Sequence, residues 1–150
     1  MLSFTISDTK TFMSLLLKGT AFDDFLFCQG EISAFAFLSI DGKRDMDYYP
    51  DTETETRCSW AEIKPLVFQA VKGKKIPKQM KLVLARPKAD LLSYPNLRDV
   101  FWNLIFRDNT LLCTLSVLEE TFSMDKAAEK QWEEWVLSFC KTHNITVQKG

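Results

Sequence analysis

Apolar and polar positions along this chain alternate in segments of the length of β-strands. "LSFTI" at residues 2–6 alternates strictly, as a half-buried strand does. "ISAFAFLSI" at 32–40 is largely apolar on both faces, which predicts a central strand covered on both sides. The remaining segments of this kind lie at 22–28, 79–85, 99–107 and 111–118.

Polar residues that favour turns separate these segments. "QGE" at 29–31 predicts a tight turn between the second and third strands. "DNT" at 108–110 predicts the clearest hairpin of the chain. The segment 41–57 is acidic, has no period and contains Gly42 and Pro50, so we expect a long flexible loop there.

Apolar residues at helical spacing predict two helices in the first half of the chain. Ser7 is placed to cap the first. Ser59 and Glu62 have the spacing of a capping box, and the helix that they begin is expected to end at Gly73. Pro65 either delays the start of this second helix or distorts its second turn.

The last helix has the strongest periodicity in the sequence. We expect Ser123 to cap it, Asp125 to lie in its first turn and Asn144 to end it. Its apolar stripe consists of Trp132, Trp135, Val136, Phe139, Cys140 and His143. The stripe is expected to be buried against the sheet.

The resulting order of elements is β-α-β-β-α-β-β-β-α. Hairpins in place of regular βαβ alternation predict the α+β class, with about six mostly antiparallel strands and a long C-terminal helix packed on one face. The length of 150 residues predicts a single domain, 1–150. Twelve Phe and four Trp predict an aromatic core.

Six segments of the sequence together resemble a known family. They are "SDTKTFMSLLL", "FDDFLFCQGEISAF", "SIDG", "SWAEIKPLVFQAVKGKKIP", "CTLSVLEETFSMDK" and "WEEWV". The resemblance is to a family of uncharacterised single-domain bacterial proteins, found mainly in anaerobic Gram-positive bacteria. It covers nearly the whole chain and implies no catalytic residues.

Composition and motifs narrow the classes of function. The formal net charge of −1 provides no overall field for nucleic acid. No signal peptide or membrane span is visible, and the four separated cysteines predict a reduced, cytoplasmic protein without a membrane partner. Phosphate-binding glycine motifs and metal-ligand patterns are absent from the sequence, so we expect no cofactor, no metal and no recognisable catalytic set.

Two further groups of residues have the side-chain types of a functional site. Cys140 and His143 share a helix face, but an apolar stripe is a poor setting for a nucleophile. The carboxylates of 41–55 are of the type that binds Ca²⁺ or Mg²⁺, although their spacing does not match an EF-hand. A solvated loop is the favoured interpretation of that segment.

The segment "VKGKKIPKQMK" at 71–81 has five lysines and no acid. Its candidate anion-binding residues are Lys72, Lys74, Lys75 and Lys78. Three interpretations stay open: a solvated connection, a site for an anionic ligand or nucleic acid, and a partner for the acidic loop 41–55.

The function is therefore unknown from sequence, and a non-enzymatic binding protein with a basic loop at 72–81 is favoured. One alternative is a small-molecule-binding domain with a pocket between the sheet and the C-terminal helix, lined by Trp132 or Trp135. A second alternative is an enzyme without a recognisable motif.

Overall fold

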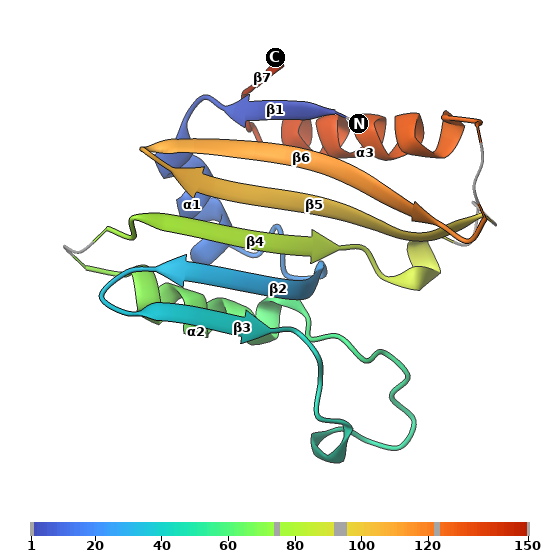
Figure 1. Ribbon diagram of the computed structural model, residues 1–150, viewed down its shortest axis with the longest axis horizontal. Coiled ribbons are helices and arrows are strands. Elements are labelled where there is room, and N and C mark those ends of the chain that lie inside the picture. The colour runs from blue at the N-terminus through green and yellow to red at the C-terminus, as the bar shows by residue number, and fades with distance from the viewer. Residues whose placement is uncertain (1, 74–75, 92–95, 122–123, 150) are drawn as a thin grey trace.

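The computed structural model describes residues 2–73, 76–91, 96–121 and 124–149. Its strands form one antiparallel seven-stranded sheet in the order β3-β2-β4-β5-β6-β1-β7 (Figure 1). The strands are β1 (Ser3–Ile6), β2 (Leu26–Ser33), β3 (Phe37–Asp41), β4 (Gln79–Ala85), β5 (Leu97–Arg107), β6 (Thr110–Glu119) and β7 (Val147–Lys149). The helices are α1 (Thr9–Leu17), α2 (Trp60–Val71) and α3 (Ala127–Thr142), with the short 3-10 helices η1 (Met46–Tyr48) and η2 (Lys88–Leu91).

The mixed class and the antiparallel sheet are as predicted, but the sheet has seven strands rather than about six. The additional strand is β7, which follows α3 and pairs with β1. It is three residues long and largely exposed, so it has no apolar alternation to reveal it.

The three helices lie behind the sheet in Figure 1, and the core is the layer between them and the sheet. Along β5, Val100, Trp102 and Leu104 are buried while the positions between them are partly exposed, as expected for a sheet covered on one face. Trp102 lies at the centre of an aromatic cluster. Its ring centroid is 5.5–6.4 Å from those of Phe4, Phe12, Phe22, Phe25 and Phe139.

Local capping explains where the first two helices begin. Asp8, not Ser7, is the N-cap of α1, and its carboxylate accepts a hydrogen bond from Thr11 N at 3.0 Å. The Ser7 N–H instead donates to Thr146 O at 3.0 Å, which extends the pairing of β1. The predicted capping box of Ser59 and Glu62 is confirmed, and α2 begins at Trp60. Pro65 therefore lies within α2 and does not delay its start.

Residues in the left-handed backbone region follow two of the helices. Gly73 has φ +96° directly after the C-cap of α2, and Asn144 has φ +58° after the C-cap of α3. Both stops agree with the prediction. Asp125 precedes α3 and accepts from Ala127 N at 2.9 Å, so it is not in the first turn. The expected cap Ser123 lies outside the described residues.

The hairpin of β2 and β3 corrects the predicted turn at 29–31. These residues lie within β2, and the chain turns at 34–36, where Ala34 N donates to Ala36 O at 3.1 Å. Gly30 lies within β2 at a position that tertiary packing keeps free of a side chain, because a Cβ there would lie 2.9 Å from side-chain atoms of Phe27 and Leu82. Residues 32–40 are thus not one central strand, and β3 is an edge strand.

The hairpin predicted at "DNT" is confirmed. Asp108 and Asn109 both have positive φ, 53° and 59°, between the paired strands β5 and β6. This is the two-residue turn whose twist matches that of the flanking strands.

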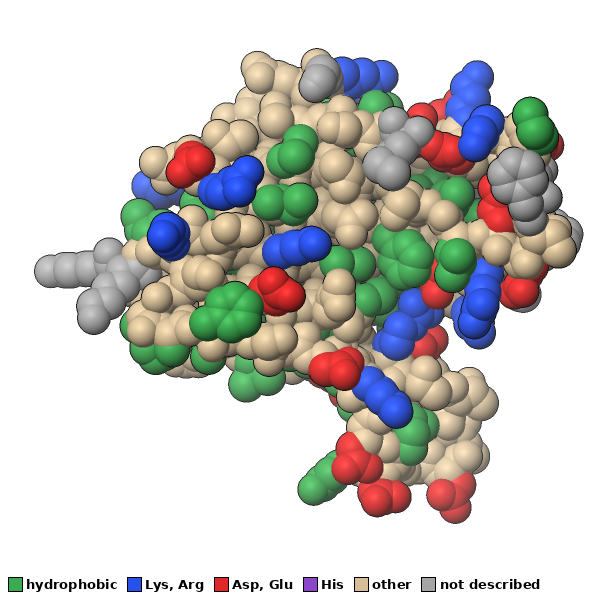
Figure 2. Space-filling view, in the orientation of Figure 1, with side chains coloured by type: hydrophobic (Ala, Val, Ile, Leu, Met, Phe, Trp, Pro, Cys, Tyr) green, Lys and Arg blue, Asp and Glu red, His purple; other side chains and the backbone are tan. Residues whose placement is uncertain are grey.

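The face of the sheet turned to the viewer in Figure 1 has none of the described helices over it. Figure 2 shows hydrophobic side chains on this face scattered among charged ones. Lys81 belongs to the same sheet, opposite Glu31 of β2 and Ile105 of β5. It is therefore a sheet residue and not part of the preceding lysine loop.

Candidate functional site

The described lysines of the basic segment are solvent-exposed at one end of α2. Lys72 is the C-cap of this helix, and the Lys78 N–H donates to Ser33 O at 2.7 Å. Lys74 and Lys75 lie outside the described residues. Figure 1 places the acidic loop 41–57 at the opposite end of α2. Lys72 and Lys78 therefore do not pair with that loop, and an external partner or solvent stays open for them.

The acidic loop is attached to α2 by a network around Glu62. The Arg44 Nη2 lies 2.7 Å from Glu62 Oε1, and the Tyr49 hydroxyl donates to Glu62 Oε2 at 2.5 Å. Desolvation alone would raise the pKa of Glu62, but hydrogen bonds from Tyr49, the Ser59 backbone and Arg44 outweigh it and lower the pKa to about 2. The same hydrogen bond raises the pKa of Tyr49 to about 12. These groups stabilise the loop and leave no proton donor poised near neutral pH.

No cluster of three or more His, Cys, Asp or Glu side chains suited to a metal occurs among the described residues. None of the helices in the described part of the chain has the length and apolar character needed to cross a bilayer.

The Cys140 and His143 pair lacks the setting of a catalytic nucleophile. Cys140 is 1% exposed, and its burial raises the pKa of the thiol to about 12. The His143 ring packs against Phe139, with ring centroids 4.4 Å apart. A thiol with this pKa holds almost no thiolate at neutral pH, so Cys140 is a core residue, while His143 is partly exposed beside it.

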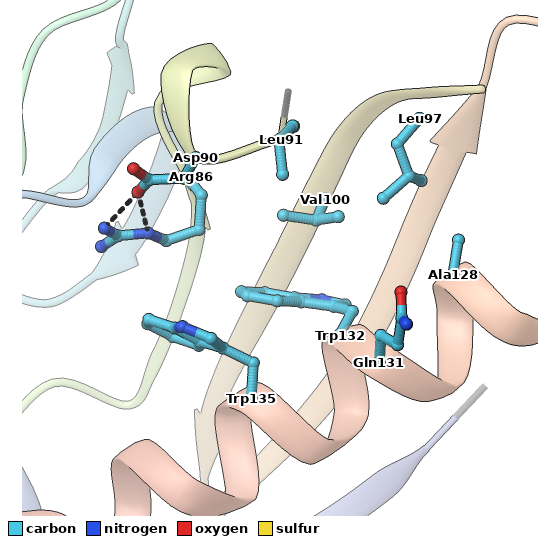
Figure 3. A pocket seen from close by; sticks show the side chains of 9 residues that line it. All are labelled: Arg86, Asp90, Leu91, Leu97, Val100, Ala128, Gln131, Trp132 and Trp135. Atoms are coloured by element: carbon cyan, nitrogen blue, oxygen red, sulfur yellow. Dashed lines mark hydrogen bonds and ion pairs between the residues drawn. The ribbon is translucent and has the colours of Figure 1, made fainter. Parts of the chain in front are cut away.

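A pocket lies between α3, the start of β5 and η2 (Figure 3). Leu91, Leu97, Val100 and the ring of Trp132 form its apolar walls. Ala128 and Gln131, from the beginning of α3, line one end, and Arg86 and Asp90 line the other. The cavity volume is about 70 Å³, well below the roughly 300–1,000 Å³ of sites that enclose a whole drug-sized ligand. The pocket therefore has room for one ring or short aliphatic group.

The helix stripe supplies the aromatic wall of this pocket. Trp132 is buried, and its indole N–H donates to Phe101 O at 3.0 Å, which fixes the ring against β5. The ring of Trp135 stacks on that of Trp132 at a centroid distance of 5.4 Å. Trp135 is 40% exposed, so the expectation that it would be buried with Val136 is wrong. It lies one turn after Trp132 on α3 and lines the pocket beside Arg86.

Arg86 closes the other end as a nearly buried cation. Its Nη2 lies 2.5 Å from Asp90 Oδ2 and 3.3 Å from Asp24 Oδ2. Its guanidinium carbon lies 4.6 Å from the centroid of the Phe25 ring and 5.0 Å from that of Trp135. The Arg86 side chain is 11% exposed, whereas Asp90 and Asp24 are 46% and 72% exposed. The ion pair thus fixes the rim and presents its carboxylates to solvent.

Sequence reasoning found the tryptophans of this pocket and missed Arg86 and Asp90. Both lie in "RPKAD", which follows the predicted strand 79–85 and has neither the alternation of a strand nor the spacing of a helix. The one local signal was the spacing of four residues between opposite charges, which the short helix η2 makes into a contact.

Residues 15–148 match the family model DUF5721, described as a family of unknown function. No curated protein and no solved structure matches the chain.

Proposed function

Because the chain belongs to DUF5721, a family whose function is unknown, we propose its function from the site: a binding protein whose pocket under α3 holds one apolar group of a ligand. The observation on which this proposal rests is the preformed apolar pocket beside a partly exposed Trp135. An aromatic or short branched group would lie on the face of Trp132, and the remainder of the ligand would extend across Trp135.

The lining residues support binding rather than catalysis. Only Arg86 and Asp90 among them carry a charge, and they are paired with each other. A paired guanidinium and carboxylate at the rim can orient a polar part of the ligand, whereas no nucleophile or base points into the apolar part.

Tryptophan fluorescence tests this function directly. Trp60 and Trp102 are 0% exposed, so a neutral quencher such as 4-nitrotoluene should act on Trp132 and Trp135. We expect saturable quenching by that probe. Ala128→Phe fills the pocket from its lining and should abolish saturation. Ala127→Phe is the matched control, because Ala127 is exposed on the same helix and does not line the pocket. Quenching that stays linear with probe concentration, or that Ala128→Phe leaves unchanged, would contradict the proposal.

A second candidate function follows from the surroundings of the basic segment. Ile76 and Pro77, in the middle of that segment, line an apolar groove of about 570 Å³ together with Met13 of α1 and Phe106 of β5. Ile76 is 70% exposed. We propose that Lys72, Lys74, Lys75 and Lys78 meet an anionic partner there, and the groove favours an anion with an apolar tail.

Decanoate binding measured by calorimetry tests this second function. Lys74→Gln/Lys75→Gln should weaken decanoate binding, because it removes two positive charges, and should leave the thermal midpoint unchanged. Equal affinity of the variant and the natural chain would contradict it. Oligonucleotide binding at about 50 mM salt, with a log–log salt slope of about −1.5 to −3.5, would instead support a nucleic-acid partner.

We also infer that residues 1–150 form one domain that works in the cytoplasm of a bacterium, in the anaerobic Gram-positive group that the sequence resemblance indicates. The four free cysteines support a reducing compartment. A thiol titration of protein taken from its natural host, showing all four reduced, would test this inference.

A further inference from the structure

A second hollow lies on the opposite side of η2 from the pocket under α3. It is the cleft between residues 54–57 of the acidic loop and residues 87–89 and 98–99, and its volume is about 650 Å³. Figure 2 shows the body hollowed where this loop projects from it, with Lys and Arg side chains at the border. The volume falls within the roughly 300–1,000 Å³ of sites for whole small ligands.

Arg57 lies between the two carboxylates of the cleft. Its Nε is 3.2 Å from Glu55 Oε1, and its Nη1 is 3.0 Å from Asp99 Oδ1. All three side chains are at most 25% exposed. The guanidinium is therefore held in a fixed orientation, while its Nη2 makes no hydrogen bond within the described residues. A fork of N–H donors fixed in this way is the arrangement that recognises phosphate oxygens.

Lys88 and Arg98 give the cleft its net positive charge. Both line it, both are exposed, and neither has an ion pair within the described part of the chain. Three cations (Arg57, Lys88 and Arg98) and two carboxylates (Glu55 and Asp99) line the cleft, so its lining has a net charge of +1, and both carboxylates pair with Arg57. Like charges brought to one cleft repel one another, and a bound anion would relieve that repulsion.

We propose that this cleft binds the phosphate group of a small phosphorylated ligand. Lys88 and Arg98 supply the charge, and the Nη2 of Arg57 supplies an oriented donor. The hydroxyls of Thr54 and Thr56, which also line the cleft, suit the polar remainder of such a ligand. The site is distinct from both the apolar pocket and the basic segment 72–81.

A titration of ¹⁵N-labelled protein with pyrophosphate, followed by amide chemical shifts, tests the proposal. We expect saturable shifts at residues 54–57, 88–89 and 98–99, at pyrophosphate concentrations below about 10 mM. Sodium chloride at the same ionic strength should not produce them. Lys88→Gln/Arg98→Gln should weaken binding on the order of tenfold or more, because both lost charges face the ligand.

The matched control is Lys130→Gln/Lys141→Gln, which removes two exposed positive charges of α3 that line neither this cleft nor the other two hollows. It should bind pyrophosphate as the natural chain does. An equal loss in this control would show attraction by net charge alone and overturn the proposal, as would shifts confined to residues 72–78 or no saturation. Glycerol 3-phosphate binding in the same cleft supports a small ligand. An oligonucleotide that binds there more tightly than pyrophosphate would overturn that assignment.

Discussion

Trp60 and Trp102 are both 0% exposed, yet only one of their indole N–H groups has an acceptor. Trp60 Nε1 donates to Leu16 O at 2.8 Å, which satisfies a carbonyl at the C-terminal end of α1. Trp102 Nε1 has no hydrogen-bond partner within the described residues. The Cys113 thiol lies beside it, but sulfur is a weak acceptor and the geometry falls short of a hydrogen bond. The same substitution at the two positions should therefore have different costs.

The expected costs follow from the two surroundings. Replacing a buried indole by a phenyl ring removes about three ring atoms, a loss of about 2 kcal/mol at about 0.8 kcal/mol for each buried group. In Trp102→Phe this loss is offset by removal of an unpaired donor, which is worth about 1–3 kcal/mol. We expect a stability within about 1 kcal/mol of the natural chain. In Trp60→Phe the loss is increased by about 1–2 kcal/mol for the stranded Leu16 carbonyl, to about 3–4 kcal/mol.

Urea unfolding followed by far-UV circular dichroism measures both variants without relying on tryptophan emission. The informative quantity is the difference between the two free energies of unfolding, expected to be about 2–4 kcal/mol in favour of Trp102→Phe. Equal losses at the two positions would refute the reasoning, because they would mean that the Trp102 N–H is satisfied in solution or that its cavity dominates. Trp102→Ala should cost about 3–5 kcal/mol or more, since five neighbouring rings lose their contact.

Three further predictions concern pH, thiols and backbone. The pKa of Glu62, lowered to about 2, lies below its ordinary value of 4.5, so its contribution to stability should be complete above pH 4.5 and be lost as the pH falls toward 2. In denaturant titrations at several pH values, Glu62→Gln should be less stable than the natural chain at pH 7 and match it near pH 2; parallel curves would contradict this. Burial raises the pKa of the Cys113 and Cys140 thiols to about 12, so neither should react with a thiol reagent in the native state. About four equivalents of the reagent should react after denaturation. Fast labelling of Cys140 in the native protein would contradict its assignment to the core. Gly73→Ala should lower the free energy of unfolding by about 1 kcal/mol in thermal unfolding. The cause is the φ of +96° alone, because no other atom lies within 4 Å of an added Cβ. An unchanged stability would show that the turn can relax.

The parts of this fold that were predictable are those determined by neighbours in sequence. The Ser59 capping box, the Asp108–Asn109 turn and the stop at Gly73 depend on residues within a few positions of each other. Gly30 misled the prediction because its small size serves the packing of Phe27 and Leu82, and that packing exists only after β2 and β4 pair. A glycine required by a tertiary contact has the same local appearance as one required by a turn.

The residues of the candidate sites were likewise predictable where they belong to one element and not where they come from several. Trp132 and Trp135 were found because helical spacing alone puts them on neighbouring turns of one helix. Arg57, Lys88 and Arg98 were not grouped, because they come from segments that only the sheet and η2 bring to one cleft. Charge patterns within one element can be recognised from sequence. Charged residues that come together from different elements can be grouped only when the order of the strands in the sheet is known.

The place of β1 in the sheet sets the order in which this chain can fold. β1 lies between β6 and β7, so that Phe4 is paired with Cys113 on one side and Lys149 on the other. During synthesis the first strand therefore emerges long before either of its neighbours exists, while the β5–β6 hairpin can form as soon as it is made. Closing so long a loop is a slow step, because its entropy is lost before any contact compensates for it. β7 is thus the strand that covers the second edge of β1. A nascent chain halted before residue 147 would leave that edge of β1 unpaired and able to pair with another molecule.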